Sequence, residues 1–156
     1  MAGIDRRTFG ALALGAVLVR SGSVAAASPT MTVHKDPTCG CCGAWVDHVR
    51  AAGYETRVID DPAISALKSR LGVPVALRSC HTAEIEGYVL EGHVPANAIA
   101  KLLAERPKAR GLAVPGMPVG SLGMEVAGVE VDSYDVMLFG NGEARTFMRF
   151  KGAVEI

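Results

Sequence analysis

The sequence predicts an α/β protein with a thioredoxin-like core in the order β-α-β-α-β-β-α, followed by a C-terminal loop and β-hairpin extension. Apolar residues with strand and helix periodicity follow one another in that order. A C-x-x-C spacing also lies between the first predicted strand and the first predicted helix. A β-α-β pattern with C-x-x-C at this position is typical of thioredoxin-like redox proteins.

The N-terminal residues 1–27 have the layout of an export signal. Arg6-Arg7 precede an apolar run over residues 9–19, which is too short to span a bilayer. Small residues follow, and cleavage is expected after Ala27. The arginine pair resembles a twin-arginine signal, although a general secretory signal shares this layout. We therefore expect the mature chain to reside in the periplasm.

The first half of the core is expected to be a right-handed β-α-β unit. Residues 31–35 predict the first strand, and the helical pattern after the cysteines ends at Gly53. Residues 54–60 predict the second strand. Asp61-Pro62 has the chemistry of a helix start, and Gly72 ends that second helix.

The thioredoxin-like core is expected to span residues 28–106. The sequence of its second half predicts a hairpin and a third helix. The segments HTAEI and YVLEG flank the turn Glu86-Gly87. Pro95 opens the third helix and Pro107 stops it.

Residues 107–156 follow as a C-terminal extension. Their first part is rich in glycine and proline and predicts a loop. The segment YDVMLFGNGEARTFMRF then predicts a β-hairpin that turns at Asn141-Gly142. A segment of about 50 residues is short for a separate domain, so we expect the extension to pack on the core.

Composition excludes several classes of partner. The 16 basic and 16 acidic residues cancel, which gives no electrostatic reason to expect nucleic acid. The mature chain has no apolar run long enough to span a membrane. No motif for nucleotide binding or hydrolysis is present in the sequence, so the chemistry rests on the cysteines.

Three of the four cysteines, Cys39, Cys41 and Cys42, lie in DPTCGCCGAW, and Cys80 lies in RSCHTAE. A helix N-terminus stabilises thiolates, so the pKa of the clustered thiols should fall. Cys39 and Cys42 have the spacing of a disulfide or a redox dithiol, and Cys41 is a surplus sulfur. In the thioredoxin arrangement the strand that follows Cys80 starts near this loop, so a fourth sulfur should face the cluster.

Several thiolates suit Cu(I), zinc or an iron–sulfur centre. Structural zinc sites usually have two C-x-x-C-like motifs, and this sequence has only one. Iron–sulfur sites usually need more widely spread cysteines. Cu(I) also accepts the imidazole and thioether ligands that lie nearby in the sequence, which are His81, His93, Met117 and Met124. Structural interpretations stay open: a disulfide with one odd thiol, methionines that fill the core, and a packing role for His81.

Motifs in DPTCGCCGAW, LRSCHTA, GYVLEGHVP, LLAERP, GLAVPGMPVGS and GME resemble the DUF411 family of small exported metal-binding proteins, whose copper-resistance members are called CopG. The resemblance runs from about Thr30 to the C-terminus. It implies a thioredoxin-like fold, copper association, and a role in periplasmic copper tolerance. Leu122 stands where we expect proline in relatives. The resemblance also implies a set of sulfur ligands, Cys39, Cys41, Cys42 and Cys80, with His93 as a further ligand.

Two functions from different classes follow. The first is a periplasmic copper-binding protein that holds Cu(I), with redox chemistry between Cu(I) and Cu(II) as an open extension. Its predicted ligands are the four cysteines, His93, Met117 and Met124, and its partners are copper ions and other periplasmic copper-handling proteins. The second is a thiol–disulfide oxidoreductase that acts on protein partners through Cys39 and Cys42. The first is preferred because dithiol chemistry leaves Cys41 unexplained.

Overall fold

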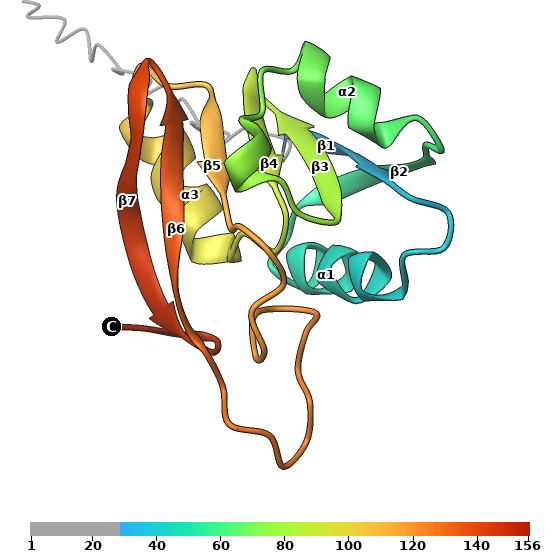
Figure 1. Cartoon of the computed structure of the whole chain (residues 1–156), viewed down its shortest axis with the longest axis vertical. Coiled ribbons are helices and arrows are strands. Elements are labelled where there is room, and N and C mark those ends of the chain that lie inside the picture. The colour runs from blue at the N-terminus through green and yellow to red at the C-terminus, as the bar shows by residue number, and fades with distance from the viewer. Residues whose placement is uncertain (1–28) are drawn as a thin grey trace, which may run out of the picture.

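The computed structural model describes residues 29–156 as a single eight-stranded sheet with three α-helices (Figure 1). The strand order in the sheet is β2-β1-β3-β4-β5-β6-β7-β8. The predicted export signal, residues 1–27, lies outside the described part of the chain. No helix in the described part is long and apolar enough to cross a membrane.

The first β-α-β unit has the predicted elements. β1 (Thr30–Lys35) leads into α1 (Gly40–Ala51), and β2 (Glu55–Asp60) returns to pair in parallel with β1. α2 (Ile64–Arg70) begins later than the sequence predicted. The side chain of Asp61 accepts the backbone N–H of Ala63 at 2.8 Å, so Asp61-Pro62 forms a turn before the helix.

The rest of the core also follows the predicted order. A short 3-10 helix, η1 (Val75–Leu77), precedes β3 (His81–Ile85), which is antiparallel to both β1 and β4 (Tyr88–Glu91). α3 (Ala96–Glu105) follows, and its C-cap Arg106 adopts a left-handed conformation directly before Pro107.

The extension continues the core sheet, which the sequence did not predict. β5 (Gly111–Ala113), predicted as loop, pairs in parallel with β4 and antiparallel with β6 (Ser133–Gly140). Gly111 permits this pairing, because a Cβ there would lie 1.7 Å from the carbonyl oxygen of Val89. The sheet then ends with the predicted hairpin, β6 and β7 (Gly142–Lys151), and with β8 (Val154–Glu155).

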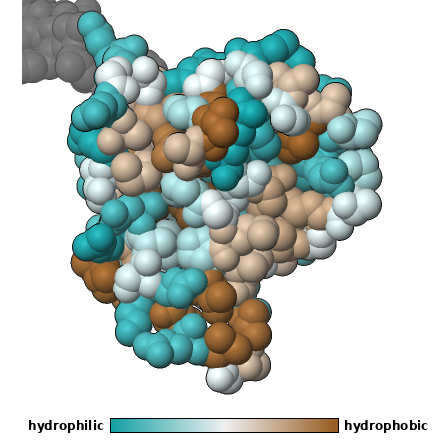
Figure 2. Space-filling model, viewed as in Figure 1, coloured by the Kyte–Doolittle hydropathy of each residue, from teal (hydrophilic) through white to brown (hydrophobic). Residues whose placement is uncertain are grey.

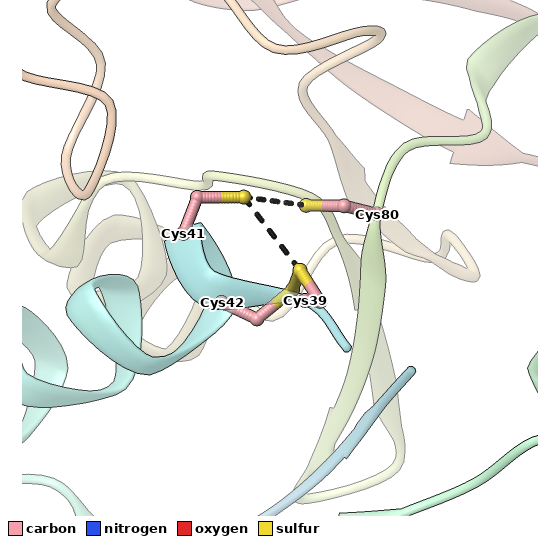
Figure 3. Close-up of side chains that lie close together, drawn as sticks. All are labelled: Cys39, Cys41, Cys42 and Cys80. Carbon is pink, nitrogen blue, oxygen red and sulfur yellow. Dashed lines mark hydrogen bonds between the residues drawn. A yellow bond between two sulfur atoms is a disulfide. The ribbon is translucent and has the colours of Figure 1, made fainter. Parts of the chain in front are cut away.

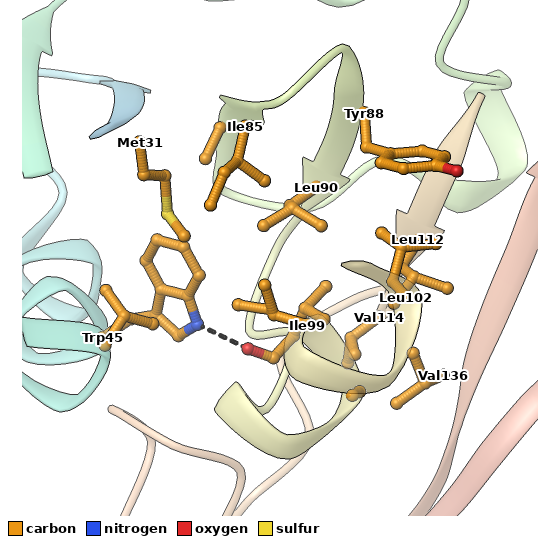
Figure 4. Packing of buried hydrophobic residues seen from close by; sticks show 14 of the residues in the cluster. Met31, Trp45, Ile85, Tyr88, Leu90, Ile99, Leu102, Leu112, Val114 and Val136 are labelled. Atoms are coloured by element: carbon orange, nitrogen blue, oxygen red, sulfur yellow. Dashed lines mark hydrogen bonds between the residues drawn. The ribbon is translucent and has the colours of Figure 1, made fainter. Parts of the chain in front are cut away.

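One hydrophobic cluster runs through the core and the extension (Figure 4). Trp45 of α1 is fully buried in it and donates its indole N–H to the carbonyl oxygen of Val94 at 3.0 Å. Strand residues of the extension, such as Leu112 and Phe150, belong to the same cluster. Alternate residues of β4, β5 and β6 form a smaller cluster with Val73 and Leu77 on the other face of the sheet.

A long loop, residues 114–132, joins β5 to β6 (Figure 1). At Gly123 it comes close to the backbone of α1 at Cys41 and Trp45. Its exposed large apolar side chains are Met117, Val126, Val129 and Val131. Figure 2 shows apolar residues gathered on the lobe that this loop forms. We call residues 114–132 the β5–β6 loop below.

Candidate metal centre

The cysteine cluster forms at the N-terminal end of α1. A turn places Cys39, whose backbone N–H donates to the carbonyl oxygen of Asp36 at 3.0 Å. Cys39 is the N-cap of α1 in extended conformation, and Cys41 and Cys42 follow in the first helical turn. Cys42 is fully buried, whereas Cys39 and Cys41 are half-buried. The cluster therefore has a buried side and an accessible side.

All four cysteine sulfurs lie together (Figure 3). Cys39 and Cys42 form a disulfide, and Cys41 and Cys80 are free. The Sγ of Cys41 lies 3.6 Å from that of Cys39 and 4.0 Å from that of Cys80. The fourth sulfur thus faces the cluster, as the sequence analysis expected.

Two histidines meet the same sulfur. Cys80 Sγ lies 3.2 Å from His81 Nδ1 and 3.1 Å from His93 Nε2. His93 Nδ1 lies 2.8 Å from the carbonyl oxygen of Leu122, so this nitrogen carries the proton and donates it. The lone pair of Nε2 therefore points toward Cys80, which is the orientation of a metal-binding imidazole.

His81 is not among the predicted ligands, but it lies at the centre with Cys80 and His93. It is fully buried and packs on Trp45, with ring centroids 4.3 Å apart. Its Nε2 has no hydrogen-bond partner among the described residues, which is uncommon for a buried polar atom. Neighbouring side chains in a strand point to opposite faces. Cys80 lies just before β3, so this alternation does not apply to it. The side chains of Cys80 and His81 can therefore both reach the centre.

Burial sets the protonation of this part of the centre. It raises the pKa of the Cys80 thiol to about 11, and the nearby Cys41 thiol adds to that shift. Burial also lowers the pKa of His93, and it lowers the pKa of His81 well below its usual value. The metal-free centre therefore holds a neutral Cys80 thiol between two neutral imidazoles at neutral pH.

These side chains form two overlapping ligand groups. One contains Cys39, Cys41, Cys42 and Cys80, and the other contains Cys80, His81 and His93. Within each group the potential ligand atoms lie within 4.8 Å of one another. Because Cys80 belongs to both, the groups make one continuous set of four sulfur and two nitrogen donors. Such donors favour soft metals.

The two predicted methionine ligands lie in the β5–β6 loop. Met117 is 52% exposed, which excludes a core-filling role, and Met124 is half-buried. The Ser79 hydroxyl donates to the carbonyl oxygen of Gly116, which holds the residue before Met117 next to the residue before Cys80. Their part in metal binding stays a prediction.

Three further contacts tie the β5–β6 loop to the centre and to α1. The Leu122 carbonyl holds His93, and the Glu125 carboxylate lies 2.9 Å from Nε2 of His48 on α1. Gly123 lies so close to α1 that a Cβ there would be 2.7 Å from the backbone nitrogen of Trp45. This contact explains why the extension, and not only the core, shapes the centre.

The chain is similar to two solved structures of copper resistance proteins. A solved structure described as copper resistance protein copG, Form 2, is 44% identical, with a TM-score of 0.75. The match covers 79% of this chain and 98% of that one. Form 1 of copG is 45% identical over the same shares, with a TM-score of 0.73.

The family model described as "Protein of unknown function, DUF411" matches residues 77–124, which contain Cys80, His93 and the two loop methionines. No curated protein matches the chain. The resemblance stated from the sequence motifs is confirmed by the family model and by both solved structures. The chain belongs to the DUF411 family.

Proposed function

We propose that this protein binds copper, as Cu(I), and serves copper resistance. The observation that carries the proposal is the pair of ligand groups that share Cys80, with four sulfurs and two imidazole nitrogens in one centre. Cu(I) accepts thiolate and imidazole ligands, and sulfurs that bridge can hold more than one ion. The two similar solved structures, at 44% and 45% identity, are of copper resistance proteins.

The fold supports a thioredoxin-like interpretation of this centre. The strand order β2-β1-β3-β4, with β2 parallel and β3 antiparallel to β1, agrees with that arrangement. The cysteines lie between β1 and α1, which is where thioredoxin-like proteins keep their redox pair. The β5–β6 loop then supplies the carbonyl that orients His93 and the thioethers of Met117 and Met124. A dithiol enzyme needs neither feature.

Metal binding by all four sulfurs requires the Cys39–Cys42 disulfide to be reduced. Two electrons and two protons convert the disulfide to two thiols, and a thiol or dithiol reductant supplies them. The thiols then lose their protons as the metal binds, because the thiolate is the ligand. The redox state of this pair therefore determines how many sulfurs the centre offers.

The test is a titration of the fully reduced protein with Cu(I) against a chromophoric competitor, without oxygen. We expect uptake of more than one Cu(I) per chain. Cys39→Ser and Cys42→Ser should each weaken the binding, because each removes a sulfur of the larger ligand group. Met148→Leu, which replaces a buried sulfur of the core on β7, is the control and should bind as the native chain does. A reduced native chain that takes up no Cu(I) would rule the proposal out.

The methionine ligands have their own test. Met117→Leu and Met124→Leu remove a thioether while keeping an apolar side chain of similar volume. If the thioethers bind Cu(I), each change lowers the affinity in the same competition assay. Unchanged affinity in both variants would remove the β5–β6 loop methionines from the ligand set.

A second function, thiol–disulfide exchange with protein partners, is favoured by the disulfide itself. Cys39 is half-buried at the end of α1, whereas Cys42 is fully buried, so a partner thiolate reaches Cys39 Sγ first. The Cys39–Cys42 bond then breaks as the mixed disulfide forms. The partner's second thiol releases Cys39, so the partner loses two electrons and the protein gains them.

The two functions can coexist, because two Cu(I) ions that become Cu(II) also release the two electrons that reduce this disulfide. Cys42→Ser distinguishes them. In this variant the free Cys39 thiolate attacks a partner's disulfide, one partner thiol leaves, and the mixed disulfide persists because Cys42 is not there to resolve it. The matched control is the double variant with Cys39→Ser, which cannot form that bond. No mixed disulfide with host proteins would count against the exchange function.

We propose that the mature protein works in the periplasm, together with other copper-handling proteins there. The layout of residues 1–27 and a disulfide at the centre agree with an oxidising, exported location. Replacement of both Arg6 and Arg7 by lysine should retain the precursor in the cytoplasm if export uses the twin-arginine pathway. Cell fractionation with an antibody measures this, and unchanged export would assign a general secretory signal.

A further inference from the structure

A buried ion pair lies next to the metal centre. Lys68 of α2 is 4% exposed and Glu91 of β4 is fully buried, and Lys68 Nζ lies 2.5 Å from Glu91 Oε1. Thr82 of β3 joins them, since it accepts from Lys68 Nζ at 2.9 Å and donates to Glu91 Oε2 at 2.6 Å. Three elements of the core thus meet at one carboxylate.

The same carboxylate holds the backbone beside the shared cysteine. The Ser79 N–H donates to Glu91 Oε1 at 2.6 Å. Residues 78–80 belong to no helix or strand, so no regular backbone ladder fixes this stretch. Glu91 takes the place of such a ladder one residue before Cys80, the sulfur that both ligand groups share.

Packing alone does not account for a charged pair here. Burying two opposite charges is costly, and apolar residues of similar volume usually hold a core as well or better. An apolar pair could fill the space between α2 and β4, but it could not accept the Ser79 N–H. The charged pair therefore retains one property that an apolar pair lacks, which is an acceptor aimed at the backbone of the Cys80 segment.

We infer that Glu91 is a positioning residue for the metal centre, with Lys68 as its buried counter-charge. Glu91 holds Ser79, so Cys80 Sγ keeps its place between Cys41, His81 and His93. Lys68 neutralises the carboxylate, so Glu91 adds no net negative charge beside the cysteine sulfurs. This inference rests on the proposed function, since it concerns how the same centre is kept in shape for Cu(I).

Two double variants separate positioning from stability. Both replace Lys68 by methionine, so neither leaves a lone buried charge. Glu91→Gln retains an amide oxygen that can accept the Ser79 N–H, whereas Glu91→Leu retains only the volume. As a control, Asp135→Asn with Arg149→Gln removes an ion pair between β6 and β7, neither of which pairs with the network strands β3 and β4.

Three quantities are measured on the reduced proteins: the thermal midpoint, the Cu(I) affinity, and the alkylation rate of Cys80 relative to Cys41 in the metal-free state. We expect K68M/E91L to fold and to bind Cu(I) about 10- to 100-fold more weakly, the usual loss when a group that orients a ligand is removed. Cys80 should be alkylated several-fold faster, because its segment is no longer held. K68M/E91Q should regain most of the Cu(I) affinity, and its Cys80 alkylation rate should return most of the way to that of the native chain.

Equal Cu(I) affinities and equal Cys80 rates in the two folded double variants would overturn the inference. The alkylation rate needs no metal, so it tests positioning even if the native chain binds no Cu(I), an outcome that would instead refute the proposed function. If K68M/E91L does not fold, Thr82→Val takes its place, since it removes one bond to Glu91 and leaves both charges. Faster Cys80 alkylation in the folded Thr82→Val protein supports the inference, and an unchanged rate overturns it.

Discussion

At the residue scale, Cys80 connects the two halves of the centre. Its sulfur contacts Cys41 on one side and two imidazoles on the other, and its thiol is neutral in the metal-free protein because burial raises its pKa. A soft metal that binds this sulfur must displace its proton. The proposed binding of Cu(I) would therefore be linked to pH through a residue that the helix N-terminus does not activate.

The first prediction concerns this proton. The Cys80 pKa is about 11, so the thiol stays protonated across the neutral range, and raising the pH weakens the competition of protons with the metal. The Cu(I) affinity should rise by about tenfold per pH unit for each proton displaced. Competition titrations between pH 6.5 and 8.5 measure the slope. Cys80→Ser should lower the slope by one proton, and an equal slope in both proteins would contradict the prediction.

The second prediction concerns His81, whose pKa burial holds well below the usual value of 6.5. The unfolded chain binds a proton near that usual value and the folded chain does not, so protons favour unfolding. The stability is fully present above about pH 6.5 and is lost as the pH falls, by up to about 1.4 kcal/mol per pH unit for this residue.

Urea unfolding of the metal-free protein at pH 7.5 and 5.5 measures this loss. His81→Asn should fold with a smaller difference between the two pH values, because asparagine does not titrate. His93, whose pKa is also lowered, should contribute in the same direction. A difference that His81→Asn leaves unchanged would show that other groups cause the acid sensitivity.

At the element scale, the β5–β6 loop turns a helix terminus into a closed centre. Gly123 has a left-handed φ of 90°, and its Cα lies against the backbone of α1 at Trp45 and Cys41. The preceding residue, Leu122, supplies the carbonyl that orients His93. The loop can therefore hold His93 only while it stays in contact with the first turns of α1.

The third prediction follows from this contact. Gly123→Ala should push the β5–β6 loop away from α1, release His93 from Leu122, and lower the Cu(I) affinity by about tenfold or more. Gly128→Ala is a matched control, because Gly128 also has a positive φ but nothing within 4 Å of its added Cβ. Both changes cost backbone strain of about 1–3 kcal/mol. Only Gly123→Ala should change the metal affinity, and equal affinities would show that the contact is not needed.

The elements of the core could be predicted from the sequence, because each has its own apolar period and its own stop signals. β5 could not, since a three-residue strand at Gly111 has no period, and its place depends on a close approach to Val89. Likewise, no local pattern indicates that Lys68 is buried, and its burial is explained by the partner Glu91, 23 positions further along the chain. Tertiary contacts determine these features.

The centre shows the same division. The four cysteines could be grouped from their spacing and the fold class, whereas the place of His81 beside Cys80 depends on where β3 begins. The carbonyl of Leu122 that orients His93 comes from 29 residues away, and no local pattern indicates it. The sequence thus indicated that the four sulfurs lie together, but it did not indicate the carbonyl that orients His93.

At the scale of the whole molecule, one sheet joins the cysteine centre to the C-terminal hairpin. The larger hydrophobic cluster contains Trp45 of α1 together with Val136 and Phe150 of the extension. No boundary between core and extension interrupts this cluster, although the two lie on opposite sides of residue 106 in the sequence. The described chain should therefore unfold as one cooperative unit.

The last prediction tests this unity with the only tryptophan, Trp45, which lies in α1 beside the cysteines. Phe150→Ala empties a fully buried position in β7 and should cost about 3–5 kcal/mol. If the sheet is one unit, Trp45 fluorescence should report that whole loss, in a single transition that coincides with the transition seen by far-UV circular dichroism. Val154→Ala, at a 67% exposed position in β8, is the control and should leave the midpoint almost unchanged. If Phe150→Ala left the Trp45 transition unchanged, the extension would fold separately from the core. The centre would then not depend on the stability of the extension.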